Sequence, residues 1–191
     1  MGEIQLSILT PAVPKRMLQI AELCEELERQ IGGQPVEHLV LIDNKRRTVG
    51  EKRDALLRAA RGEFVAFVDD DDTVAPTYVR DLLAVANLLP DVITFRQQAT
   101  VNGLVGEVEF RLGNPNDPFT PGATTKRNAW HVCAWRRRLA VQSRFPATNY
   151  GEDWAYAAPL CALPGIKEIH VPKVLHYYHH DAATTEAPMP K

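Results

Sequence analysis

Residues 64–73, Phe-Val-Ala-Phe-Val-Asp-Asp-Asp-Asp-Thr, constrain the fold of this chain more than any other stretch. The first five are apolar or small, which predicts a strand buried on both faces, and the carboxylates Asp69 to Asp72 follow without a break. Adjacent ionised carboxylates repel unless a cation or water screens them. Hard divalent ions take oxygen ligands and bind phosphates, so the run predicts a Mg²⁺ or Mn²⁺ site with a phosphorylated ligand. The alternative is a solvated turn with an Asp cap before Pro76.

Strands and helices are expected to alternate through the first half of the chain. Such alternation predicts parallel strands joined by right-handed helical crossovers. The fold is therefore predicted to be α/β, with a mostly parallel central sheet and helices on both faces. Ligands of such sheets bind beyond the carboxyl ends of the strands, where Asp43 and Asp69 are expected. Besides 64–68, strands are expected at 4–8, 38–42 and 91–95, and Thr10-Pro11 is expected to end the first of these. The expected helices are 17–31, a second that Gly62 closes and a third that Pro76 opens.

The second half has a different pattern. Asn102-Gly103 lies between two strand-like segments, 97–101 and 104–112, and is a strong hairpin signal. We therefore expect a small antiparallel portion. The other expectations are a mobile loop or lid at 113–125, a helix opened by Glu152-Asp153, short strands at 167–171 and 174–178, and a flexible tail at 182–191. Residues 1–181 are predicted to form one domain.

Composition narrows the class of protein. The chain has 191 residues, a formal net charge of -2 and three widely spaced cysteines, which fits a single domain with free thiols. It has no apolar run long enough to span a membrane and no signal-peptide pattern, so a cytoplasmic location is expected. Basic clusters, such as residues 45–47, could contact phosphates.

Several short motifs, taken in order, resemble one family. They are Thr10-Pro11, Asp43 after the second strand, Gly-Glu-Lys-Arg-Asp at 50–54, the Asp-tipped strand, and Gly-Glu-Asp-Trp at 151–154. Together they resemble a family 2 glycosyltransferase of the Rossmann-like GT-A fold, of the compact type found in phages and surface-polysaccharide clusters. The resemblance implies an enzyme that transfers a hexose from a nucleotide sugar, with residues 1–95 binding the nucleotide and 96–181 the acceptor.

The resemblance also implies roles for residues around the donor. Asp43 matches the aspartate that contacts the nucleotide base, and Thr10 and Pro11 match the loop lining the same pocket. Arg53 lies in a basic segment on the nucleotide side. The three basic residues after Asp43 depart from the family pattern, which commonly has small polar residues there.

The metal ligands and the catalytic base are implied in the same way. Asp71 corresponds to a direct ligand of Mn²⁺ or Mg²⁺, Asp69 lies nearer the ribose and metal-bound water, and Asp70 supports them. His179 is the candidate third metal ligand. The general base and its acidic companion are Asp153 and Glu152.

The implied reaction is inverting transfer from a UDP-sugar to an acceptor hydroxyl, through an oxocarbenium-like state. The acceptor is expected to be a hydroxymethylated pyrimidine in DNA or an envelope saccharide. Two alternatives remain open. Asp69-x-Asp71 also fits the nucleophile motif of haloacid-dehalogenase-type phosphatases, and the chain could be an inactive sugar-nucleotide-binding module. Asp153 could also be only a helix N-terminal acid.

Overall fold

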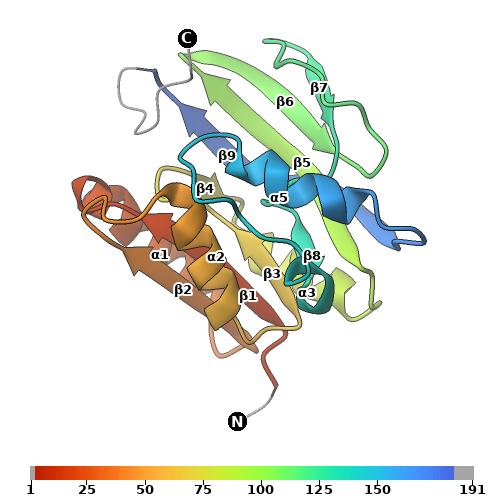
Figure 1. The fold of residues 1–191 in the computed structure, drawn as a ribbon, viewed down its shortest axis with the longest axis horizontal. Helices are drawn as coiled ribbons and strands as arrows, with labels where there is room; N and C mark the ends of the chain where they lie inside the picture. The colour runs from red at the N-terminus through yellow and green to blue at the C-terminus, as the bar shows by residue number, and fades with distance from the viewer. Residues whose placement is uncertain (1–2, 183–191) are drawn as a thin grey trace.

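The Asp-tipped strand lies inside one large sheet. In the computed structural model, which describes residues 3–182, nine strands form this sheet, in the order β2-β1-β3-β8-β5-β6-β7, with β9 paired to β5 and β4 paired to β9 (Figure 1). The strands are β1 (Leu6–Ala12), β2 (Val36–Ile42), β3 (Phe64–Phe67), β4 (Thr73–Val74), β5 (Val92–Val101), β6 (Leu104–Phe110), β7 (Thr124–Arg127), β8 (Ala134–Arg136) and β9 (Glu168–His180). The helices are η1 (Pro14–Arg16), α1 (Met17–Ile31), α2 (Val49–Ala59), α3 (Tyr78–Ala86), α4 (Arg137–Ala140) and α5 (Glu152–Cys161).

The predicted α/β class is confirmed. β1 pairs in parallel with β2 and β3, and β9 pairs in parallel with β5. β8 lies between β3 and β5 and is antiparallel to both, so β5 runs in the same direction as β3. The hairpin at Asn102-Gly103 is also confirmed, since β5 and β6 pair across it and both residues have positive φ values, 49° and 79°. The sheet is therefore mostly parallel, with an antiparallel portion in the second half.

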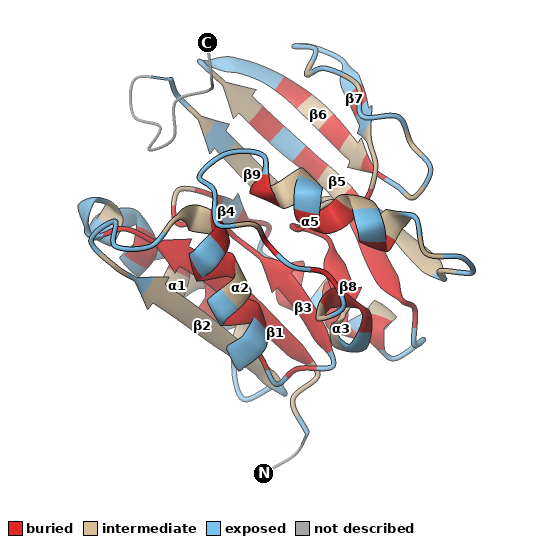
Figure 2. Ribbon diagram, in the orientation of Figure 1, coloured by how far each residue is buried: buried red, intermediate tan, exposed pale blue. Residues whose placement is uncertain are grey.

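Helices cover both faces because successive residues of the central strands point to opposite sides. Ile8 of β1 and Ala66 of β3 belong to one buried cluster, which includes side chains of α1 and α3. Their neighbours Leu9 and Phe67 belong to a second cluster, which includes side chains of α2 and α5. Figure 2 shows β1 and β3 buried along their length. The near-continuous apolar run at 64–68 reflects this double burial.

The first strand is longer than predicted. Thr10-Pro11 was expected to end it, but β1 continues to Ala12 and pairs with β2 along its whole length. Leu9 O accepts a hydrogen bond from Val68 N, on the β3 side. Since residues two apart point the same way, Pro11 turns its missing N–H toward that side, beyond the last β1–β3 pair at Leu9. The proline therefore removes no bond from the ladder.

Two predicted strands near the C-terminus are in fact one. β9 runs through Pro172, which was expected to interrupt it. The pairing with β5 changes register there, because Phe95 is opposite Val171 and Arg96 is opposite Val174. The bulge accommodates the proline, and the long β9 then reaches the acidic run through its antiparallel pairing with β4.

Other differences are smaller. β7 begins inside the segment predicted as a loop, at Thr124, and pairs in parallel with β6. β5 crosses residue 95, the predicted boundary between the two halves. The predicted tail lies outside the described residues, apart from Ala182. Among the helices of residues 3–182, none combines the length and the apolar character needed to cross a bilayer.

The pairing of β1 with β2 generates a prediction about pH. His38 of β2 has its Nε2 atom 3.0 Å from Thr10 Oγ1, and burial lowers the pKa of His38 from 6.5 to about 4. Between these values the unfolded chain binds more protons than the folded protein, so the free energy of unfolding falls as pH falls from 6.5 toward 4. We expect the stability advantage of the wild type over His38→Gln to shrink by about 2 kcal/mol between pH 7 and pH 4.5, measured by urea denaturation. A difference that does not vary with pH would contradict this assignment.

Candidate functional site

The site is built where three parallel strands end at one edge of the sheet. β1 ends at Ala12, β2 is followed by Asp43, and β3 is followed within two residues by Asp69. Lys52 of α2 ties two of these ends together. Its Nζ atom donates to Ala12 O at 2.9 Å and lies 3.5 Å from Asp43 Oδ1, with the side chain only 3% exposed. Lys52 therefore joins the end of β1 to the carboxylate that follows β2.

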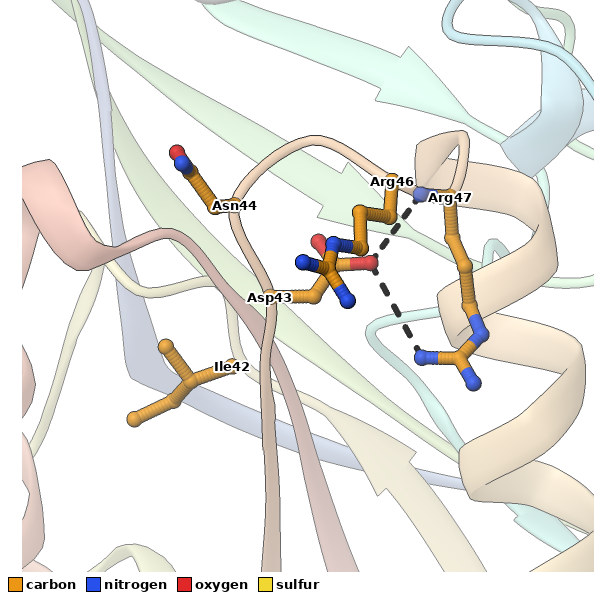
Figure 3. Close-up of a pocket in the computed structure, with 5 residues that line it drawn as sticks. All are labelled: Ile42, Asp43, Asn44, Arg46 and Arg47. Atoms are coloured by element: carbon orange, nitrogen blue, oxygen red, sulfur yellow. Dashed lines mark hydrogen bonds and ion pairs between the residues drawn. The ribbon is translucent and has the colours of Figure 1, made fainter.

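A pocket of about 470 Å³ opens at Asp43. It is lined by Ile42, Asp43, Asn44, Arg46 and Arg47 (Figure 3). Asp43 Oδ2 accepts a hydrogen bond from Arg47 N at 3.0 Å and lies 3.8 Å from the Arg47 guanidinium. Asp43 Oδ1 is buried and, among the described residues, has no hydrogen-bond partner. Lys52 and Arg47 thus hold the Asp43 carboxylate at the pocket. Arg46 and Arg47, two of the three basic residues that depart from the family pattern, line the pocket with it.

The four consecutive aspartates divide into two pairs. Asp70 and Asp72 are each 3% exposed and bind other parts of the chain. Asp70 accepts hydrogen bonds from Val13 N at 2.9 Å and from Arg16 at 2.7 Å. Asp72 accepts one from His179 N at 3.0 Å, on β9. These two carboxylates hold the segments before α1 and along β9 against the site, so the supporting role expected for Asp70 has a physical basis.

Asp69 and Asp71 are the more open pair, with side chains 26% and 29% exposed. Each has one basic partner at 2.8 Å or less: Arg53 for Asp69 and Arg16 for Asp71. Burial, reinforced by the charge of Asp69, raises the pKa of Asp71 to about 6. Burial acts in the same direction on Asp69, but the Arg53 guanidinium holds the pKa of Asp69 below its ordinary value. The pair carries concentrated negative charge that a cation would stabilise.

The donor set suits a hard divalent ion held jointly with a ligand. Asp69 Oδ1 is buried without a hydrogen-bond partner in the described chain, and Asp71 is open to solvent. Within residues 3–182, no three or more His, Cys, Asp or Glu side chains are grouped to hold a metal by themselves. Mg²⁺ commonly takes one or two carboxylates and completes its shell with water and phosphate oxygens, which these residues fit. His179 is exposed and contacts Asp72 through its backbone, so its role as a metal ligand stays a prediction.

Arg53 connects the acidic run to the second half of the chain. Its guanidinium, 4% exposed, donates to Asp69 Oδ2 at 2.8 Å and to Glu152 Oε1 at 3.3 Å. Burial raises the pKa of Glu152. Asp153 follows in the first turn of α5, where helix dipoles favour acidic residues, and its Oδ1 accepts from Trp154 N at 2.7 Å. Arg53, Asp69 and Glu152 therefore lie together, with Asp153 adjacent in sequence.

The start of α2 fastens the loop that leads to α5. Thr48 and Glu51 form a capping box, and the next free N–H groups are used by the loop: Val49 N donates to Asn149 Oδ1 at 2.9 Å, and Gly50 N donates to Thr148 O at 3.0 Å. A Cβ atom on Gly50 would lie 1.8 Å from Pro146 O. Only glycine permits this approach, which explains the glycine of the 50–54 motif.

The sequence analysis did not assign several residues of the site. Lys52 and Arg16 are such residues, although Lys52 lies in a motif that was recognised.

His131 is 6% exposed, and both its ring nitrogens lack hydrogen-bond partners in the described part of the chain. Burial, followed by the charge of Arg53, lowers the pKa of His131 well below its ordinary value. His176 is fully buried, with Nε2 3.5 Å from Asp72 Oδ2. No spacing signal in the sequence distinguishes these histidines from core residues.

Two predicted site residues contribute little side-chain surface. Thr10 is 0% exposed and its hydroxyl is bonded to His38, while Pro11 is a buried strand residue. Neither lines the pocket at Asp43. Their assignment to the nucleotide pocket stays a prediction.

The fold resembles that of solved glycosyltransferase structures. The structure titled S. aureus TarS 1-349 in complex with UDP-GlcNAc matches with a TM-score of 0.67 and 18% identity over 96% of this chain and 62% of that chain. The complex of TarS 1-349 with UDP matches with a TM-score of 0.66 and 18% identity over 93% and 61%. A longer S. aureus TarS structure matches with a TM-score of 0.62 and 16% identity. The match covers 93% of this chain and 37% of that chain. These matches define the class as GT-A, and the chain spans less than two thirds of each neighbour.

The sequence itself identifies the family. The family model described as "Glycosyl transferase family 2" matches residues 20–144, more than half of the chain. The chain therefore belongs to glycosyltransferase family 2, whose members are nucleotide-sugar-dependent transferases. A search of curated protein sequences found no match.

The close approach at Gly50 generates a prediction about stability. Gly50→Ala places its Cβ against the backbone oxygen of Pro146, which cannot move without displacing the loop before α5. We expect it to lower the free energy of unfolding by about 2 kcal/mol or more, measured by urea denaturation. Gly106→Ala is the matched control, because its Cβ would mainly meet the movable Phe119 ring, at 2.8 Å. Equal losses in the two variants would show that the approach at Gly50 is not restrictive.

Proposed function

We propose that the chain is an inverting glycosyltransferase that moves a sugar from a UDP-sugar to an acceptor hydroxyl. The observation that carries the proposal is the Arg53 bridge, which joins the open carboxylate Asp69 to Glu152, the neighbour of the candidate base Asp153. Membership of family 2 supports it. The UDP and UDP-GlcNAc complexes of TarS support UDP as the nucleotide.

The donor would bind across the ends of β2 and β3. Asp43 lines the pocket and is the residue that would accept an N–H from the nucleotide base. Arg46 and Arg47 line the same pocket and can contact the ribose or phosphate groups. Asp69 and Asp71 are the residues that would hold a divalent ion beside the diphosphate. Mn²⁺ or Mg²⁺ bound there supplies Lewis-acid stabilisation of the charge that grows on the leaving diphosphate.

The acceptor side depends on Asp153. Its carboxylate takes the proton of the acceptor hydroxyl as the new glycosidic bond forms. The hydrogen bond from Trp154 N to Oδ1 fixes the orientation of the carboxylate at the start of α5. A single base opposite the leaving group produces one displacement, and therefore inversion at the anomeric carbon. Arg53 holds Glu152 at the start of the same helix and so keeps the base in register with the donor site.

The phosphatase alternative is less well supported. Its mechanism requires Asp69 as a nucleophile, whereas Asp69 Oδ2 accepts a hydrogen bond from the Arg53 guanidinium. The family match also favours the transferase. An inactive binding module would bind UDP without turnover, and the following experiment distinguishes it.

Replacing the base should abolish transfer without affecting the donor. We expect Asp153→Asn to lower the rate of transfer or donor hydrolysis by about 10²- to 10⁴-fold, because general base catalysis contributes that much, while the Kd for UDP changes less than about twofold. Donor turnover would be measured over a panel of UDP-, GDP- and TDP-sugars with Mn²⁺. Asp81→Asn, on α3, is the control and should match the wild type, because its partners Thr77 and Lys173 are not residues of the candidate site. Full activity of Asp153→Asn would remove Asp153 from the mechanism.

The metal is tested separately. Asp71→Asn should lower the Mn²⁺-dependent gain in UDP affinity by about tenfold or more, because it removes one charged oxygen ligand from the ion. Isothermal titration of UDP with and without Mn²⁺ would measure it. Metal-independent UDP binding by the wild type would argue against the ion, and phosphate-ester hydrolysis without any nucleotide-sugar binding would favour the phosphatase.

A further inference from the structure

Arg127, the last residue of β7, has no ionic partner although it is half-buried. Within residues 3–182, no hydrogen bond or ion pair reaches its guanidinium group, and its Nε atom is fully buried. The group lies over the Trp130 ring, 4.6 Å from the ring centroid. Burial lowers the pKa of Arg127, but a guanidinium stays charged at any physiological pH. Removing such a charge from water without an anion is costly, so the position is suited to an anionic ligand.

The surroundings of Arg127 belong to the acceptor side of the site. The groups that act most strongly on its charge are Asp153, Tyr178, Asp117 and Tyr150. Among the described residues, none of these groups is within hydrogen-bonding or ion-pairing distance of the guanidinium, so it lies near the candidate base without pairing with it. Trp154, the residue after Asp153, lies beside Trp130 with ring centroids 6.2 Å apart and an angle of 36° between the rings. Arg127 and these two tryptophans thus form a charged aromatic wall beside Asp153.

We infer that this wall binds an acidic saccharide acceptor, with Arg127 pairing with a carboxylate or phosphate group on it. The inference rests on the proposed function and extends it to the class of acceptor. The planar fork of arginine pairs in a bidentate manner with either anion, and the tryptophan rings offer apolar surface to the C–H face of a sugar ring. Arg127 would anchor the charged group while Asp153 meets the acceptor hydroxyl.

The charges around the wall favour an acidic saccharide over DNA. Asp117 and Asp153 lie near enough to act on the charge of Arg127, and the acidic run acts in the same way on Tyr178. A chain of phosphates would bring several negative charges among these carboxylates, whereas one acid group can pair with Arg127 alone. Arg46 and Arg47 of the basic cluster at 45–47 line the pocket at Asp43, at the donor end.

Tryptophan fluorescence gives a direct test. Two of the three tryptophans, Trp130 and Trp154, form the wall, so a bound sugar should change their emission. The probes are methyl glucuronide and methyl glucoside, which differ by one carboxylate, and glucose 6-phosphate for the phosphate arm, each titrated with and without UDP and Mn²⁺. We expect the wild type to bind one of the anionic probes about tenfold or more tightly than the glucoside, since a charge-assisted pair contributes that much. Which anionic probe binds more tightly distinguishes carboxylate from phosphate.

Variants assign the preference to Arg127. Arg127→Gln should reduce the anionic preference to about that of the neutral sugar, and Arg127→Lys should restore part of it. Arg144→Gln is the control, because Arg144 is 76% exposed and pairs only with Asp54 among the described residues. The Kd for UDP should be unchanged in all three variants. A loss of UDP binding in Arg127→Gln would place Arg127 on the donor side and overturn the inference.

Two further outcomes would overturn the inference. One is equal binding of glucuronide, glucose 6-phosphate and glucoside, or an anionic preference that survives Arg127→Gln. The other is binding of a hydroxymethylcytosine duplex that Arg127→Gln weakens, in the absence of sugar binding. Failure of the wild type to bind UDP would instead contradict the proposed function. The sugar titrations without UDP still decide the role of Arg127 in that case.

Discussion

The site depends on the ion pairs of Arg53. This side chain lies on α2, and its guanidinium reaches Asp69 after β3 and Glu152 at the start of α5, 99 residues apart from it in sequence. The guanidinium is almost fully buried, so water does not screen its charge. The two carboxylates stabilise that charge instead. Losing either carboxylate would leave the buried charge with a single partner. The donor and acceptor sides are therefore held in one arrangement by a single cation.

Glycine and the helix N-terminus make that arrangement possible. α2 approaches the loop at 146–149 so closely that Gly50 has no room for a Cβ, and its first N–H groups bind that loop. The N-terminus of α2 is consequently occupied by protein and is not a free anion site. The same helix that carries Arg53 and Lys52 also positions the approach to Asp153. Donor contacts and the candidate base thus share one rigid support.

The acidic run shows how four identical residues acquire different roles. The turn between β3 and β4 directs Asp70 and Asp72 into the protein and leaves Asp69 and Asp71 partly open. The buried pair ties the segment before α1 and the strand β9 to the site, and the open pair is available for a cation. The repulsion among the four carboxylates is offset in two ways. Arg16 and Arg53 pair with the open pair, and backbone N–H groups donate hydrogen bonds to the buried pair.

The sequence by itself determined the α/β class, the strand at 64–67, the hairpin at Asn102-Gly103 and the family, because these depend on local periodicity, turn chemistry and short motifs. It also placed Asp43 and Asp69 at strand ends. Only the tertiary structure decided that β8 inserts between β3 and β5, that β9 continues through Pro172, and that Arg53 joins Asp69 to Glu152. Only the structure shows that the Arg127 guanidinium lies over Trp130 without an ionic partner among the described residues. These features arise from contacts between residues far apart in the chain, where burial and charge pairing override local propensity and leave no periodic signal in the sequence.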